Sequence, residues 1–187
     1  MNVSVFGGAE PAEGSSAYED ARQLGRLLAE AGHTVLTGAY IGTMEAVSRG
    51  ASEAGGHVIG VTCVEIEKWR GVTANRWVKD EWRKQSLLER LEALIRGCDA
   101  ALALPGGAGT LTEISLMWNM MIIGALEKRP LILVGKGWSD VFSLFFQDLG
   151  TYSHTNQRGL LRFAPDISAA VEMLARSAPE RTEIKHG

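Results

Sequence analysis

Cysteine is scarce in this chain, and the two that occur are far apart. Cys63 and Cys98 are the only cysteines among 187 residues. Two cysteines are too few for a disulfide framework or a cysteine-based zinc site, so we expect both thiols to be reduced. The histidines show no ligand spacing either, so we infer no metal site; they are His33, His57, His154 and His186.

An excess of one charge and a long hydrophobic run are also lacking. The formal net charge is −3, which supplies no basic field for a nucleic acid. The longest apolar run, residues 114–126, is interrupted by Ser115 and Asn119 and is too short to span a bilayer. No signal-peptide pattern precedes the first strand-like segment. We therefore expect a cytoplasmic protein that binds neither nucleic acid nor membrane.

Strand and helix patterns alternate along the chain. Short apolar runs predict strands at 3–6, 33–37, 57–62, 99–104, 130–134 and 160–163. Helical periodicity predicts helices at 17–31, from 43 toward Gly55, and at 80–96, 111–126, 138–149 and 166–175. This alternation predicts an α/β fold, a single Rossmann-like doubly wound parallel sheet with helices on both faces. We assign residues 1–176 to one domain and 177–187 to a polar C-terminal tail.

Three glycine-bearing turns follow predicted strands. In a parallel sheet the carboxyl ends of the strands lie at one edge, where ligands bind, so these turns are expected to converge on one cleft. A tight strand-to-helix connection is the simpler explanation of a glycine pair, and it explains the first turn equally well. The turns contain Gly7 and Gly8, then Gly38 and Gly42, then Gly106, Gly107 and Gly109.

Residues 105–113, Pro-Gly-Gly-Ala-Gly-Thr-Leu-Thr-Glu, carry the strongest functional pattern. Glycines with bare backbone amides at a helix start form a phosphate site, because the helix dipole favours an anion there. The predicted phosphate-binding residues are Gly106, Gly107, Gly109 and Thr110, assisted by Gly42 and Thr43, and Gly7 and Gly8 border the cleft. Glu113 fits two roles, a catalytic carboxylate or the partner of Thr110 in a capping box.

Two common nucleotide motifs are missing. The first turn has no G-x-G-x-x-G, and no acidic residue for a ribose hydroxyl ends the second predicted strand. No Walker lysine follows the glycines at 106–109, which argues against ATP hydrolysis of the P-loop type.

Arg90 is the second candidate for chemistry. It lies off the leucine stripe of the helix predicted at 80–96, and a solvated surface arginine is the alternative. Before this helix, a long loop is predicted at 63–79. Its Trp69 and Trp77 can either stack on a base or anchor the loop to the body of the protein.

The helix predicted at 111–126 is apolar almost all round. One face can cover the sheet, and the other must contact something else. A two-fold partner helix predicts a homodimer or a higher homo-oligomer. Burial under the helix at 138–149 is the alternative.

These motifs resemble the LOG family of nucleoside-monophosphate phosphoribohydrolases, which are often mislabelled as lysine decarboxylases. The family motif PGGxGTxxE matches residues 105–113. The arginine of the upstream motif MHxRK falls on Arg90, 23 residues before Glu113. Residues 38–44 resemble the family's GGGxxGLM, and residues 6–9 stand where the family has a Gly-Ser-Ser type loop. The resemblance covers roughly residues 3–135.

The resemblance implies a reaction as well as a fold. A nucleoside 5′-monophosphate is hydrolysed at its N-glycosidic bond to free base and ribose 5-phosphate, with Arg90 and Glu113 as the catalytic pair and no cofactor. Because an opposite charge lowers a carboxyl pKa, we expect Arg90 to keep Glu113 ionised, as a base or electrostatic stabiliser rather than a general acid. The chain departs from the family motifs at Leu88, Leu91 and Thr112, which replace histidine, lysine and glutamate.

Two other functions compete with this one. The first is a nucleotide- or cofactor-binding carrier without turnover, since molybdenum-cofactor carriers share this fold and a similar glycine motif. The second is a true lysine decarboxylase. It would need a lysine that forms a Schiff base with pyridoxal phosphate, and no lysine of this chain stands in a recognisable motif for it.

Overall fold

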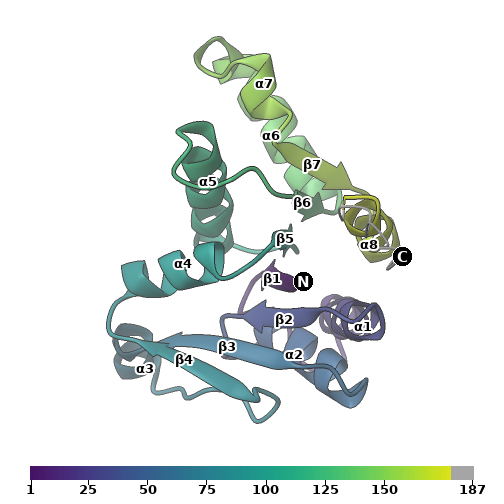
Figure 1. The fold of residues 1–187 in the computed structure, drawn as a ribbon, viewed down its shortest axis with the longest axis vertical. Helices are drawn as coiled ribbons and strands as arrows, with labels where there is room; N and C mark the ends of the chain where they lie inside the picture. The colour runs from purple at the N-terminus through teal and green to yellow at the C-terminus, as the bar shows by residue number, and fades with distance from the viewer. Residues whose placement is uncertain (178–187) are drawn as a thin grey trace, which may run out of the picture.

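The fold is a parallel sheet of seven strands between two layers of helices (Figure 1). The computed structural model describes residues 1–177. All neighbouring strands are parallel, in the order β4-β3-β2-β1-β5-β6-β7. The strands are β1 (Asn2–Phe6), β2 (Thr34–Thr37), β3 (Val58–Cys63), β4 (Asp80–Lys84), β5 (Ala100–Ala103), β6 (Leu131–Val134) and β7 (Leu161–Ala164).

Each face of the sheet has its own helices and its own core. The helices α1 (Ser16–Glu30), α2 (Thr43–Glu53) and α8 (Ile167–Ala175) cover one face. On the other face lie α4 (Leu87–Arg96), α5 (Ala108–Ile122) and α6 (Lys136–Leu149). The shorter helices are α3 (Val64–Arg70), the 3₁₀ turn η1 (Gly150–Tyr152) and α7 (Thr155–Arg158). The predicted doubly wound α/β fold is confirmed.

Local signals at the helix ends behave as the sequence predicts. The Ser15 hydroxyl accepts a hydrogen bond from the amide of Tyr18 and caps α1, and the Asp166 carboxylate caps α8 through the amide of Ala169. Such caps satisfy backbone donors that have no partner inside the helix. The polar tail predicted at 177–187 lies outside the described residues, apart from Ser177.

The segment at 63–96 differs from the prediction in two places. Residues 64–70, predicted as loop, form α3, and residues 80–84, predicted as the start of a long helix, form β4. β4 pairs only with β3 and is an edge strand, in which charged residues are tolerated because one side faces solvent. Its sequence, Asp-Glu-Trp-Arg-Lys, carries a polar pattern that is also compatible with a helix. Pairing with β3 therefore decides its conformation.

Helix α6 covers α5 only in part. Trp118 packs edge-to-face on Phe142 with 5.9 Å between ring centroids, so the alternative of burial under this helix is correct for one side of α5. Around this contact, large apolar residues remain exposed, including Leu111 on α5, Ile123 directly after it, and Val141 and Leu144 on α6.

The described residues also give three observations on the remaining predictions. Cys63 and Cys98 are free and buried. Among residues 1–177, no three histidine, cysteine or acidic side chains come together as a metal site would require. Within the same residues, no helix combines the length and apolarity needed to cross a bilayer.

Candidate active site

The site lies where the chain reverses its direction across the sheet, between β1 and β5. Loops at such a point open away from each other and leave a crevice at the carboxyl ends of the strands. Backbone hydrogen bonds connect the three glycine turns. The Gly8 amide donates to the Pro105 carbonyl at 3.2 Å, and the Thr43 amide donates to the Gly8 carbonyl at 3.0 Å. The three turns therefore converge, as the sequence predicts.

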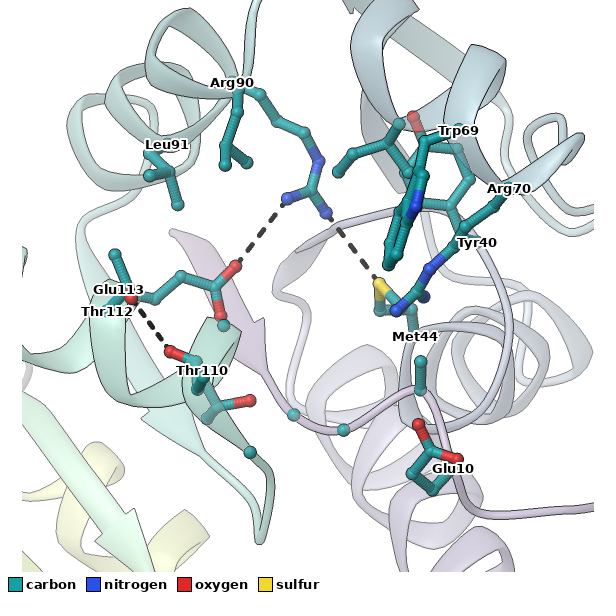
Figure 2. A pocket seen from close by; sticks show the side chains of 18 residues that line it. Glu10, Tyr40, Met44, Trp69, Arg70, Arg90, Leu91, Thr110, Thr112 and Glu113 are labelled. Atoms are coloured by element: carbon teal, nitrogen blue, oxygen red, sulfur yellow. Dashed lines mark hydrogen bonds and ion pairs between the residues drawn. The ribbon is translucent and has the colours of Figure 1, made fainter.

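A cavity of about 460 Å³ opens at this point (Figure 2). Its floor and rim come from the first turn, at Gly7 and Gly8, and from the start of α5. Its remaining walls come from Tyr40 and Met44, from α3 and from α4. A volume of this size is in the range that holds a nucleotide-sized ligand.

The start of α5 presents an uncapped helix N-terminus to the cavity. Gly107 is the residue before the helix, and no side chain caps the amides of the first turn. Among the predicted phosphate-binding residues, Gly107, Gly109 and Thr110 line the cavity. A Cβ atom built on Gly107 or on Gly109 meets no atom within 4 Å, so both positions border open space. This end of the cavity suits an anion, because free amides and the helix dipole act there together.

The other three predicted phosphate-binding residues do not line the cavity. A Cβ on Gly106 would stand 2.2 Å from Oγ1 of Thr110, and a Cβ on Gly42 would stand 2.5 Å from the backbone of Ala9. Gly42 also needs glycine because its φ is +68°. Thr43 is buried, and its amide already donates to Gly8. These residues shape the turns, and the geometry does not support the prediction that Gly42 and Thr43 contact the phosphate.

Glu113 points across the cavity floor and does not cap its helix. α5 begins at Ala108, so Thr110 is already inside the first turn and no capping box forms. The carboxylate is directed at Arg90 on α4, with 3.9 Å between Oε1 and Nη1 (Figure 2). Of the two roles that the sequence left open for Glu113, the capping role is therefore wrong.

Arg90 is buried rather than solvated. Only 5% of the residue is exposed, although it carries a charge. Nε donates to the Val61 carbonyl at 2.8 Å and Nη2 donates to the Gly38 carbonyl at 3.2 Å. The guanidinium also lies over the Tyr40 ring, 5.5 Å from its centroid. These contacts fix the guanidinium beside Glu113, and its Nη1 faces the carboxylate.

The pKa of Glu113 is raised to about 7, contrary to the expectation from sequence. Burial is the larger effect, because removing the carboxylate from water disfavours its charged form. The positive charge of Arg90 lowers the pKa but is the smaller effect at 3.9 Å. Near neutral pH the carboxyl is therefore divided between its protonated and ionised forms, and either proton uptake or proton release is accessible to it.

The two tryptophans of the segment at 63–79 have different places. Trp69 lies on α3, lines the cavity and is 75% exposed. Trp77 lies outside the cavity, and the guanidinium groups of Arg49 and Arg76 lie over its ring, 5.6 and 4.6 Å from the centroid. Trp77 therefore anchors its segment, and Trp69 alone is placed to contact a ligand.

Sequence reasoning missed several residues of the walls. Tyr40 and Arg70 line the cavity, and so does Ile66 on the unpredicted α3. Tyr40 carried a signal, because it lies inside the second glycine turn, between Gly38 and Gly42, shortly after the end of β2. Leu91 lines the cavity where the motif of the resembled family has lysine. Within the described residues, no lysine borders this cavity, which argues against Schiff-base chemistry there.

Comparison with known proteins places the chain among related sequences. The SLOG cluster4 family model matches residues 1–148. The chain is 31% identical over 141 residues to a cytokinin riboside 5′-monophosphate phosphoribohydrolase of Rhodococcoides fascians, covering 71% of this chain and 67% of that protein. It is 32% identical over 181 residues to a probable enzyme of the same name from Oryza sativa subsp. japonica, covering 95% and 78%.

Solved structures of similar fold include proteins with a different stated role. The molybdenum cofactor carrier protein of Chlamydomonas reinhardtii matches with a TM-score of 0.69 at 26% identity, covering 94% of this chain and 96% of that one. A molybdenum cofactor binding protein of Rippkaea orientalis matches with a TM-score of 0.71 at 23% identity, covering 94% and 95%. The second likeness is evidence for the fold alone.

Proposed function

The chain belongs to the SLOG cluster4 family, and on that basis we propose that it is a nucleoside 5′-monophosphate phosphoribohydrolase. One observation carries the proposal: Arg90 and Glu113 face each other, buried, within a cavity whose rim is an uncapped helix N-terminus. The names of relatives at 31% and 32% identity support the same reaction.

In the proposed complex, the 5′-phosphate lies against the start of α5. The amides of Ala108, Gly109 and Thr110 are the first-turn donors without intrahelical partners, and no side chain caps them. Anchoring the phosphate there directs the ribose toward Glu113, so that binding energy from a remote group serves the reacting carbon. Gly107 and Gly109 allow the close approach because they leave open space at the rim.

Glu113 acts at C1′ in the proposed reaction. As the bond to the base breaks, C1′ gains positive charge, which an ionised carboxylate stabilises, as in other glycoside hydrolyses. The carboxylate also accepts the proton of the water that attacks C1′. The leaving base takes a proton from solvent and Glu113 returns its proton to solvent, so one water is consumed for each free base and each ribose 5-phosphate. Arg90 keeps the carboxylate in place and favours its ionised form against the cost of burial.

The opposite wall of the cavity is suited to the base. Ile66 and Leu91 contribute apolar surface and Tyr40 and Trp69 contribute aromatic rings. Stacking and apolar contact bind a planar ring without reading its edge. Leu91 adds apolar surface where the motif of the resembled family has lysine, and Arg70, whose guanidinium lies 4.8 Å from the centroid of the Trp69 ring, is the charged residue beside these rings.

The test is incubation of the purified protein with adenosine 5′-monophosphate and a panel of other nucleoside 5′-monophosphates. Free base and ribose 5-phosphate are measured by chromatography. We expect equal amounts of both products, loss of turnover in Glu113→Gln and Arg90→Ala, and nucleotide binding that Glu113→Gln largely preserves. Turnover near the wild-type rate in Glu113→Gln would reject the assigned role.

A carrier that binds a nucleotide or cofactor intact is the alternative. The likeness to the Chlamydomonas reinhardtii carrier protein supports it, since the same fold holds a ligand there by its stated role. The two functions differ in the fate of the ligand. Tight binding of nucleotides, with no release of base from any member of the panel, would favour the carrier.

We also propose that the protein assembles as a homodimer. A groove of about 560 Å³ lies between α5 and α6, and the described residues that line it are all uncharged. Exposed apolar residues surround it on both helices. A second copy supplies an equally uncharged face, which suits a two-fold contact.

A further inference from the structure

A strained residue lies next to the buried arginine. Ala39 has a φ of +67°, and among residues 1–177 it is the one non-glycine residue with a positive φ. Such a conformation is unfavourable for alanine and persists only where surrounding contacts enforce it. The neighbours of Ala39 are Gly38 and Tyr40, whose carbonyl and ring hold Arg90.

Asn75 supplies the contacts that enforce this turn. Its backbone amide donates to the Ala39 carbonyl at 2.7 Å. Its side-chain Nδ2 donates to the Ala39 carbonyl at 2.8 Å and to the Tyr40 carbonyl at 3.0 Å. Its Oδ1 accepts from the Trp77 amide at 3.1 Å, which orients the amide group of the side chain. The residue thus joins the segment between α3 and β4 to the end of β2.

The turn fits closely around Arg90. A Cβ added to Gly38 would stand 1.9 Å from Nη2 of Arg90, so a small change at this turn would reach the guanidinium. On the far side, the Ala39 amide donates to Oγ1 of Thr37 at 3.0 Å. Hydrogen bonds therefore hold Ala39 at both of its backbone polar groups, and the Asn75 side chain contributes two of the bonds to this turn.

We propose that Asn75 is a positioning residue, which holds the strained turn at Ala39 so that the Gly38 carbonyl and the Tyr40 ring fix Arg90 beside Glu113. The kinetic consequence rests on the function proposed above. The structural consequence, a fixed guanidinium, does not depend on it. Asn75 itself does not line the cavity, so its effect passes through Arg90.

The test compares Asn75→Ala with the double variant Asn75→Ala/Ala39→Gly. Glycine adopts a positive φ without strain, so the double variant keeps the turn without the side chain of Asn75. Ala39→Gly alone and Asn156→Ala, at an exposed asparagine, are the controls. If Asn75→Ala does not fold, Asn75→Asp replaces it, because that side chain keeps the acceptor for Trp77 and loses the bonds that Nδ2 donates to the Ala39 and Tyr40 carbonyls.

Two measurements compare the variants with the wild-type protein. The first is kcat and KM for nucleotide hydrolysis, at a temperature where all variants are folded. We expect Asn75→Ala to lower kcat about tenfold with little change in KM, since small misplacements of catalytic groups cost rate. The second is the NMR signal of the Arg90 Nε–H group, assigned by its absence in Arg90→Lys. We expect this signal to shift or broaden in Asn75→Ala and to return in the double variant.

The results separate a positioning role from a merely structural one. A lower melting temperature with unchanged kcat and an unchanged Arg90 signal would overturn the proposal. So would an Asn75→Ala defect that Ala39→Gly leaves uncorrected. If the wild-type protein hydrolyses no nucleotide, the proposed reaction is wrong, and the Arg90 signal still decides whether Asn75 fixes the guanidinium.

Discussion

At the scale of single residues, Glu113 combines burial with proximity to one cation. The carboxyl is almost fully buried, and Arg90 is 3.9 Å away. A closer, bidentate pair would have kept the carboxylate ionised far below neutral pH. The longer separation leaves burial dominant and raises the pKa to about 7. An enzyme that needs a base near neutral pH gains from a group poised in this range.

This raised pKa predicts a pH-dependent stability. The folded protein binds a proton at Glu113 more tightly than the unfolded chain, whose carboxyl has its ordinary pKa of 4.5. The resulting stabilisation is complete below pH 4.5 and is lost as the pH rises through about 7. We expect the free energy of unfolding to fall by up to about 3 kcal/mol between these limits from this group.

Glu113→Gln tests that dependence, because glutamine stays neutral at every pH. We expect the variant to gain stability relative to wild type at pH 8 compared with pH 5, measured by urea unfolding at both values. Glu30→Gln, at an exposed position of α1, is the control. An equal difference from wild type at both pH values would show that Glu113 titrates normally.

We predict that one added methyl group has opposite effects on stability at two glycines of the same turn. Gly109→Ala places the methyl in open space inside a helix, where alanine is better than glycine by about 1 kcal/mol. The same methyl borders the proposed phosphate site, so we expect a higher melting temperature together with a higher KM. In Gly106→Ala the methyl would collide with Thr110 and with the backbone of Gly8, so we expect lost stability. Thermal unfolding and steady-state kinetics of both variants check the contrast.

At the scale of secondary-structure elements, the sequence predicts most of the sheet but not its edge. Six strands follow apolar runs, which have few alternatives to burial between helix layers. β4 has no such run, and it is set by pairing with β3, a tertiary contact that no local pattern contains. α3 is also short, and none of its residues is buried, so its sequence shows no amphipathic stripe.

The candidate site was also predictable only in part from local sequence patterns. Residues 105–113 carry a local motif, and their position at a strand end follows from the alternation of elements. The burial of Arg90 and the raised pKa of Glu113 depend on distances between α4, α5 and the end of β2, which the sequence does not encode locally. Asn75 and Ala39 lie 36 residues apart, and each looks ordinary by itself.

The position of Trp69 on helix α3 leads to a prediction about how the base is bound. Glu67 binds Arg83 at 2.6 Å and Glu65 accepts from the Leu87 amide at 2.7 Å, so the helix stays placed without a buried side chain. We therefore expect Trp69→Ala to keep the fold. Loss of stacking should raise KM for nucleotides by roughly 5- to 150-fold, as about 1–3 kcal/mol per base implies. Inhibition by ribose 5-phosphate, which has no base, should not change.

The control for Trp69→Ala is Lys68→Ala, since Lys68 is an exposed residue of the same helix that does not line this cavity. An equal weakening of nucleotide and ribose 5-phosphate in Trp69→Ala would mean that Trp69 shapes the cavity without stacking on a base. In that case the base would have to be bound by the Tyr40 and Leu91 part of the wall.

At the scale of the whole molecule, the two helix layers differ in how much apolar surface they leave exposed. Helices α1, α2 and α8 bury their apolar residues on the sheet, whereas α5 and α6 keep apolar residues exposed around an uncharged groove. Large exposed apolar patches on a globular protein mark interaction sites. Leu111 lines this groove and Thr112, the next residue, lines the cavity, so a partner on the groove would lie next to the proposed active site.

If the dimer forms through this face, a single charged substitution there should dissociate it into monomers. Ile123 and Leu144 are 68% and 58% exposed, so glutamate at either position leaves the monomer folded. At a two-fold contact each substitution introduces a charge from both copies, and burial of those charges disfavours association. We expect Ile123→Glu and Leu144→Glu to halve the mass measured by light scattering, with unchanged melting of the monomer. Gln23→Glu, which adds the same charge on exposed α1, should remain dimeric. A wild-type protein that is monomeric at every concentration would reject this face as the contact between copies.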